Sequence, residues 1–337
     1  MLYYIIRRSI AAVLMLAVIS VVTFFMFYAG PTDPARLTCG KNCTPVSIEA
    51  NRRALGLDKP VPVQYAAFVK GLFVERIFPD DPVFQKANPD KITRCPAPCL
   101  GYSALQTKLV TDIVKERLPV TVSITLGAFF LWIVLGVGFG IIAALRRGSI
   151  VDRGLVSIAL VLYSFPAFFI ALLMYNYLST QWGLLPPPAY VSIFDSPAQW
   201  FQGLLLPWLS LASLFAAAYI RLTRAYMLET MGEDYLRTAR AKGLNERTVV
   251  LKHTLRAALT PIVTVAGLDL GGLLAGAAIT ETVFNFQGFG RAVVSSVTTF
   301  DLPVIVALVL VAAFFIVVAN LVVDVLYGVI DPRVRLA

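Results

Sequence analysis

Long apolar runs alternate with short polar stretches along most of the chain, and each run is long enough to cross a bilayer as a helix. The six runs that we expect to be membrane spans lie near 9–29, 118–145, 154–180, 203–221, 261–282 and 303–328. The first run follows Arg7 and Arg8, lacks a small-residue cleavage site and is longer than a signal-peptide core. It is therefore predicted to stay in the protein as a span. The pattern predicts an all-α integral membrane protein with six transmembrane helices.

The basic residues of the short loops predict the orientation of these spans. The loops 146–153 and 221–256 are basic, whereas 181–202 contains no Lys or Arg. Because Lys and Arg accumulate in cytoplasmic loops, both chain ends are expected in the cytoplasm. This orientation places 30–115, a polar stretch rich in Pro, Asp and Asn, outside the cell.

Composition excludes several other classes of protein. A mean hydropathy of +0.76 with 58% hydrophobic residues does not suit a soluble protein. The net charge of +9 is explained by the positive loops, so we expect no nucleic-acid partner. The chain has no Gly-x4-Gly-Lys-Ser/Thr sequence and one His, so we expect no ATP site, no metal site and no catalytic residues in this chain.

All four cysteines lie in the segment 30–115, which we call the insert. Cys39 and Cys43 form one CxxxC pair, and Cys95 and Cys99 form another. In an oxidising compartment disulfides are favoured over zinc, whose ligand pairs are commonly spaced more closely. All three pairings remain open, and links between the two clusters are our favoured hypothesis.

One polar segment interrupts the membrane-like sequence at 229–260, and we call it the polar island. It predicts a short helix that ends at Gly243 in a left-handed conformation and a second helix capped by Asn245. Leu236 and Ala239 are expected to face a soluble partner, with Pro261 in the first turn of the next span. An ordinary positive loop is the alternative interpretation.

Polar and small residues inside the spans allow both structural and functional interpretations. Asp269 either lines a path through the protein or pairs with a buried donor. Thr121, Ser123 and Thr125 could bind a peptide backbone or their own helix carbonyls. The GxxxG pairs, such as Gly267 with Gly271, favour close helix packing.

Several ordered motifs resemble one family. DYLRTARAKGLNERTVVLKHTLRAAL, at 234–259, is similar to the coupling segment of bacterial binding-protein-dependent ABC importer permeases, in particular the B-type subunit of the dipeptide, oligopeptide and nickel group. Here Arg237-Thr238-Ala239 replaces the Glu-Ala-Ala of the wider superfamily, while Gly243 retains its glycine. Further matching segments are Gly30-Pro-Thr-Asp-Pro34, Glu116-Arg-Leu-Pro119, Glu281-Thr-Val-Phe284, Gly288-Phe-Gly-Arg291 and Asp331-Pro-Arg333.

The resemblance implies a type I ABC importer permease of the bacterial cytoplasmic membrane. Its implied partners are a second related permease, two ATPase subunits that bind ATP and Mg, an extracellular solute-binding protein and the lipid bilayer. The implied domains are 1–29, the insert 30–115, the permease domain 116–330 and a cytoplasmic tail 331–337. The implied cargo is a dipeptide or oligopeptide, with a nickel chelate, glutathione or another small solute as the alternative, and a stand-alone ion-coupled carrier as a remote one.

The resemblance also assigns candidate residues. The residues implied to dock the ATPase are Tyr235, Leu236, Arg237, Thr238, Ala239, Arg240, Lys242, Gly243 and Leu244. The spans themselves and the resemblance together give the candidate path or gate residues, which are Thr125, Asp269, Thr280 and Glu281.

Overall fold

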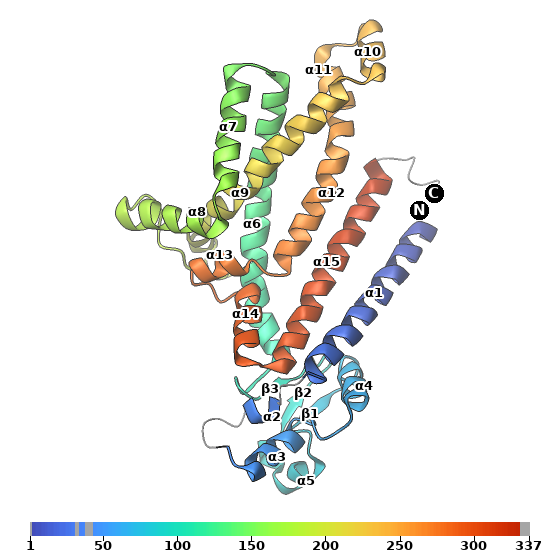
Figure 1. Cartoon of the computed structure of the whole chain (residues 1–337), viewed down its shortest axis with the longest axis vertical. Helices are drawn as coiled ribbons and strands as arrows, with labels where there is room; N and C mark the ends of the chain where they lie inside the picture. Colours follow the sequence, from blue (N-terminus) through green and yellow to red (C-terminus); the bar gives the residue numbers. More distant parts are fainter. Residues whose placement is uncertain (1, 31–33, 38–42, 331–337) are drawn as a thin grey trace.

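The computed structural model describes residues 2–30, 34–37 and 43–330, so Cys39 and the tail 331–337 lie outside the described residues. Five helices of this part of the chain are long and apolar enough to cross a membrane. They are α1 (Leu2–Tyr28), α6 (Val110–Leu145), α9 (Pro197–Met231), α12 (Leu255–Leu274) and α15 (Leu302–Ile330). These helices run along the long axis of the molecule (Figure 1).

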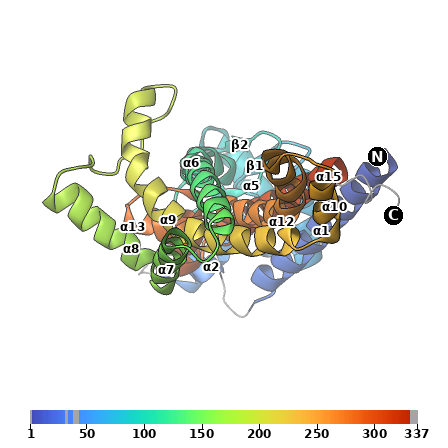
Figure 2. The same cartoon turned by 90° about the horizontal axis from the view of Figure 1, so that it is seen from above.

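The run predicted as a continuous span at 154–180 is broken. It forms α7 (Ile150–Ser164) and α8 (Ala167–Met174), with a π-helical extension at Tyr175–Gln181, and its two halves meet at 101°. Pro166 disfavours the helical conformation of the residue before it, and Phe165 is extended, with ψ of 143°. As a result, α8 lies across the other helices and projects from the body of the molecule (Figures 1 and 2).

The span predicted at 261–282 is shifted along the chain. Helix α12 begins at Leu255 and ends at Leu274. It continues through Pro261 without a break, because Pro261 removes only one helical hydrogen bond and neighbouring helices hold the segment in place. Two shorter helices then follow, α13 (Ala278–Val283) and α14 (Phe289–Thr299). Glu281 therefore lies on α13 and not at the end of a long span.

The insert folds into short helices and two small antiparallel strand pairs. Its helices are α2 (Pro34–Leu37), α3 (Pro45–Ala54), α4 (Val61–Gly71), α5 (Pro82–Ala87) and a 3-10 turn at Pro89–Lys91. Its strands are β1 (Arg76–Phe78) paired with β2 (Thr93–Cys95), and β3 (Tyr102–Ser103) paired with β4 (Lys108–Leu109). It lies at the end of the molecule opposite the polar island (Figure 1).

A disulfide joins Cys95 to Cys99 inside this insert, and both residues are fully buried. Cys43 is also disulfide-bonded. The favoured hypothesis of links between the two cysteine clusters is therefore wrong for Cys95 and Cys99. The two residues are four positions apart with Cα atoms 5.5 Å from each other, which is within the range that a disulfide bridges.

Small residues bring the long helices close together. A Cβ on Gly136 of α6 would meet Tyr219 of α9 at 2.5 Å, and one on Gly140 would meet Thr223 at 2.5 Å. On α12, Gly267 and Gly271 lie against α15 in the same way. These contacts support the helix-packing interpretation of the glycines.

Candidate functional site

The polar island forms a short hairpin of helices beyond the end of α9. Helix α10 (Asp234–Ala241) ends before Gly243, whose φ of 78° is the left-handed conformation predicted from the sequence. A Cβ added to Gly243 would have open space around it, so the backbone conformation alone favours glycine. Asn245 caps α11 (Glu246–Thr248), as predicted, by accepting a hydrogen bond from the Arg247 backbone N–H at 3.1 Å.

A two-point ion pair holds α10 against α11. Arg240 donates from Nε to one carboxylate oxygen of Glu246 at 3.1 Å and from Nη2 to the other at 2.9 Å. This hydrogen bonding raises the pKa of Arg240, so its guanidinium stays charged. The pair is exposed and adds little to stability, but its fork geometry fixes the relative direction of the two helices.

Leu236 and Ala239 do not form an outward face, contrary to the prediction. Leu236 is fully buried and Ala239 is partly buried. Helix α10 packs on the π-helical segment Val249–Thr254, so its apolar side is covered by its own chain. The exposed members of the predicted docking set are Tyr235, Arg237, Thr238, Arg240, Lys242, Gly243 and Leu244.

The polar island is anchored to three long helices. Val250 of the π-helical segment packs in a buried cluster with Ala144 of α6, Met227 of α9 and Ala258 of α12. The segment also runs directly into α12 without a turn. A displacement of the island would therefore be passed to the ends of α6, α9 and α12.

Asp269 is half-buried in the middle of the protein and has one polar partner among the described residues. Tyr219 Oη of α9 donates a hydrogen bond to Asp269 Oδ2 at 2.7 Å. Tyr219 is itself buried and lies beside Trp132 of α6, with ring centroids 6.3 Å apart. This arrangement fixes the carboxylate in one orientation and contains no basic partner for it within the described part of the chain.

Glu281 joins three segments at the end of the bundle nearer the insert. It is fully buried, accepts a hydrogen bond from Thr121 Oγ1 of α6 at 2.5 Å and another from the Arg291 backbone N–H of α14 at 2.7 Å. Thr121 Oγ1 in turn accepts from the Phe289 backbone N–H at 2.7 Å. The carboxylate therefore ties α13 and the start of α14 to α6, and Thr280 beside it is also buried.

The hydroxyl groups of the α6 segment bond to other helices, which was not among the predicted alternatives. Thr125 Oγ1 donates to the Leu273 carbonyl of α12 at 3.3 Å. Ser123 Oγ accepts from Trp200 Nε1 at 3.2 Å, and its carbonyl accepts from Trp208 Nε1 at 2.9 Å. These groups are used to join helices, so they are not free for a peptide in this conformation.

Sequence reasoning did not identify Tyr219 as a site residue. It is one of several aromatic residues in an apolar run, and its contact with Asp269 joins residues 50 positions apart. The available signal was that a carboxylate within a span requires a hydrogen-bond donor on a neighbouring helix.

Comparison with known proteins identifies the family. Residues 136–336 match the family described as binding-protein-dependent transport system inner membrane component, and 1–125 match the N-terminal part of that membrane component. A protein of Brucella abortus named as a peptide transport system permease is 36% identical over 98% of both chains. A glutathione transport system permease of Escherichia coli K12 is 36% identical over 99% of both chains.

A solved structure supports the fold. The inward-facing MetNI methionine ABC transporter matches with a TM-score of 0.50 at 17% identity, covering 66% of this chain and 97% of that chain. The predicted all-α permease fold is therefore confirmed. The chain belongs to the family of inner-membrane components of binding-protein-dependent transport systems, and it is a multi-pass permease of the inner membrane.

Proposed function

We propose that this permease imports dipeptides or oligopeptides across the inner membrane, driven by ATP hydrolysis in partner ATPase subunits. The observation that carries the proposal is the near end-to-end match to relatives named as peptide transport permeases, at 36% identity over 98% of both chains in Brucella abortus and 34% over 98% and 99% in Sinorhizobium fredii. The glutathione permease of Escherichia coli, at the same 36% identity, supports a small peptide such as glutathione as the second candidate cargo.

The polar island is the surface that we assign to the ATPase. It projects beyond the long helices at one end of the molecule (Figure 1), and it exposes Tyr235, Arg237, Lys242 and Leu244. Mixed aromatic, aliphatic and basic side chains on a short rigid element suit a protein–protein contact. ATP-driven closure of the ATPases would move the island, and the shared cluster around Val250 would move α6, α9 and α12 with it.

A second permease and an extracellular binding protein complete the proposed assembly. Helices α7 and α8 expose many large apolar side chains, including Phe168, Phe169 and Leu172. Lipid or a paired permease can cover such surfaces, and a pair of permeases would enclose a path between them. Asp269, half-buried in the centre of the chain, is the carboxylate that we place at the edge of this path. Glu281 would hold α13 and α14 in place at its outer mouth.

The test of this function changes Gly243 in the reconstituted transporter with its ATPases and binding protein. A Val at φ of 78° is strained by about 1–2 kcal/mol, enough to change the exit from α10 while leaving the spans intact. We expect Gly243→Val to lower ATP-dependent uptake of a radiolabelled dipeptide about tenfold, with ATP hydrolysis either lost or no longer stimulated by the binding protein.

Gly183 supplies the matched control. It has φ of 61° and open space where a Cβ would lie, but it belongs to the loop after α8, away from the polar island. Gly183→Val should keep uptake and hydrolysis coupled. Normal uptake and normal ATP hydrolysis in Gly243→Val would show that the polar island has no part in coupling. Uptake in the absence of any ATPase would instead support a stand-alone carrier. Competition by unlabelled oligopeptides or glutathione identifies the cargo.

A further inference from the structure

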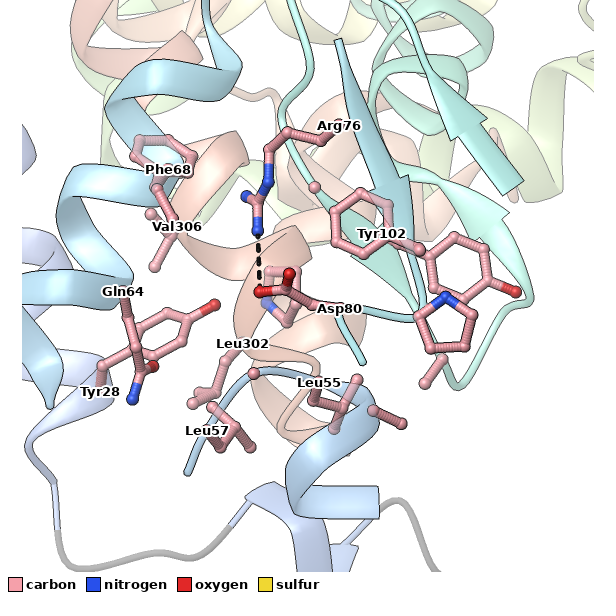
Figure 3. Close-up of a pocket in the computed structure, with 18 of the residues that line it drawn as sticks. Tyr28, Leu55, Leu57, Gln64, Phe68, Arg76, Asp80, Tyr102, Leu302 and Val306 are labelled. Carbon is pink, nitrogen blue, oxygen red and sulfur yellow. Dashed lines mark ion pairs between the residues drawn. The ribbon is translucent and has the colours of Figure 1, made fainter. Parts of the chain in front are cut away.

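A cavity of about 300 Å³ lies between the insert and the ends of α1 and α15 (Figure 3). Its apolar wall comes from all three parts. This wall includes Phe24, Tyr28, Leu57, Phe68, Leu302 and Val306. The only charged side chains that line it within the described residues are Lys59, Arg76, Asp80 and Asp301. The cavity lies at the insert end of the molecule, opposite the polar island (Figure 1), and its lining includes none of the residues assigned to transport above.

Arg76 directs its guanidinium into this cavity without a hydrogen bond to any described residue (Figure 3). Its side chain is 20% exposed, its stem lies against Gly71, and the guanidinium carbon lies 4.8 Å from the centre of the Phe78 ring. Burial lowers the pKa of Arg76. A guanidinium has five donors in a fixed fork, and a buried one is stabilised by an anion that accepts them.

The carboxylates already present do not satisfy this group. Asp80 lies 3.0 Å from Lys59 Nζ, whereas its closest approach to Arg76 is 3.9 Å. Two cations thus share one carboxylate. Asp301 also lines the cavity, but it is almost fully buried and accepts a hydrogen bond from Ser103 Oγ at 2.5 Å. Within the described residues Asp301 forms no ion pair with Arg76, so the guanidinium has only its long contact with Asp80.

The position of the cavity indicates the kind of anion. Helix α1 ends at Tyr28 and α15 begins at Leu302, so the cavity lies where these two spans leave the membrane on the insert side. Its apolar base is the buried cluster of Phe24, Phe68 and Val306. A ligand with an anionic head would pair with the Arg76 guanidinium, and its apolar body would pack on this base.

We infer that this cavity binds an anionic amphiphile, with a carboxylate or phosphate head on Arg76 and one alkyl chain between α1, α15 and α4. The shared chemistry is an anionic head on an apolar chain, supplied either by a free fatty acid or by a lipid of the outer leaflet. Such a ligand would bridge the insert and the two spans and hold them together.

The test uses the complete transporter in lipid nanodiscs and a dodecanoic acid that carries a diazirine on its chain. After irradiation, labelling should be saturable and should map to peptides that contain Phe68 or Leu302. Dodecanoate and dodecyl phosphate should compete with the probe. Dodecanol, which has the same chain without a charge, should compete about tenfold less well, since a charge-assisted hydrogen bond contributes at least that factor.

Two variants and one control complete the test. Arg76→Gln should lower the labelling about tenfold. Ala67→Phe should abolish it by filling the cavity while leaving Arg76 in place. Arg94→Gln is the matched control, because Arg94 lies on the paired strand β2 but is exposed and does not line the cavity. An intact Cys95–Cys99 disulfide in each variant verifies that the insert is folded.

The remaining outcomes decide the source of the ligand and the validity of the inference. If labelling is weaker in nanodiscs of phosphatidylglycerol than in nanodiscs of phosphatidylcholine, the site is assigned to a membrane lipid. An absence of suppression, with competition by dodecanoate retained, would assign it to a free amphiphile. The inference is overturned if dodecanol competes equally, if a transported peptide displaces the probe, or if Arg94→Gln lowers labelling as much as Arg76→Gln.

Discussion

Single polar side chains within the bundle act mainly as links between helices. Thr125 bonds to α12, Thr121 bonds to Glu281, and Tyr219 bonds to Asp269. In a medium without water each unpaired polar group is costly, so residues from neighbouring helices are used to satisfy one another. Asp269 differs because its carboxylate is half-buried and only one of its oxygens is held by a described partner.

Substitutions of Tyr219 and Asp269 separate stability from transport. Tyr219→Phe removes the donor and should lower the stability by about 1–3 kcal/mol, seen as a lower Tm. Asp269→Asn keeps an oxygen that accepts the hydrogen bond of Tyr219, so Tm should change less. If the charge acts on the cargo, uptake should fall in Asp269→Asn.

The two measurements are the thermal unfolding of the purified transporter and the uptake in vesicles. Thr264→Val is a control for the same helix, since among the residues that the structure describes its hydroxyl bonds only to its own helix, at the Thr260 carbonyl. Normal uptake by a normally assembled Asp269→Asn protein would show that the ionised carboxylate has no required part in transport.

The sequence located the polar residues within the spans, but it did not predict their partners. Asp269 is recognisable because an acidic residue in an apolar run is rare, and Gly243 because a helix ends there. The partner of Asp269 depends on how α9 packs beside α12, which local pattern does not determine. Leu236 was placed on the wrong side for a similar reason: its helix has one apolar face, and the sequence does not say whether another chain or its own chain covers that face.

At the scale of whole helices, proline ends one helix but lies inside another. Pro166 ends α7, and the chain turns by 101°, whereas Pro261 lies inside α12 without ending it. The polar island shows a related effect, since the second helix expected there is mostly π-helical and continues into α12. The apolar runs located the five long helices and the broken pair α7 and α8 of the described chain, but the breaks within the runs depended on packing against other helices.

The ion pair between α10 and α11 predicts a rescue experiment. Arg240→Glu and Glu246→Arg each place like charges side by side and should weaken the coupling of ATP hydrolysis to uptake. The double variant Arg240→Glu with Glu246→Arg restores opposite charges. We expect it to recover much of the coupled uptake, because the geometry between the helices is what the pair maintains.

The pair Arg53 with Glu49 is the control, because it is also exposed, lies within α3 alone and belongs to the insert, at the end of the molecule opposite the polar island. Swapping its charges should have little effect on the helix geometry. Loss of coupling that persists in the Arg240 and Glu246 double variant would show instead that Arg240 contacts an acidic group of the ATPase.

The molecule as a whole combines a membrane bundle with an insert that has its own small core. Phe78, Cys95 and Cys99 are buried in this core, with Tyr102 and Leu109 packed against them. The sequence predicted an oxidised, non-membrane segment here because polar residues and all four cysteines fall in one loop. It could not predict the pairing, since the position of Cys95 relative to Cys43 depends on the folded insert.

The disulfide between Cys95 and Cys99 predicts a pattern of chemical labelling. Alkylation of protein purified without reductant, followed by mass spectrometry, should leave both residues unlabelled and give a peptide linked between them. The double variant Cys95→Ser with Cys99→Ser should lose about 2 kcal/mol, the value for a short closed loop, and show a lower Tm. A peptide that links Cys95 or Cys99 to Cys43 would contradict this pairing.

The contact between the first and the last helix has a consequence for biogenesis. Helix α1 packs on α15, and Arg8 lies 3.2 Å from Asp324 across this contact. During synthesis α1 leaves the ribosome about three hundred residues before the helix that covers it. Until α15 has been synthesised and inserted, α1 is therefore in contact with lipid or with the insertion machinery and not with α15. In a nascent chain arrested before Leu302, α1 would therefore lack the helix that it packs against. Such a chain would be exposed to the quality-control proteases of the membrane.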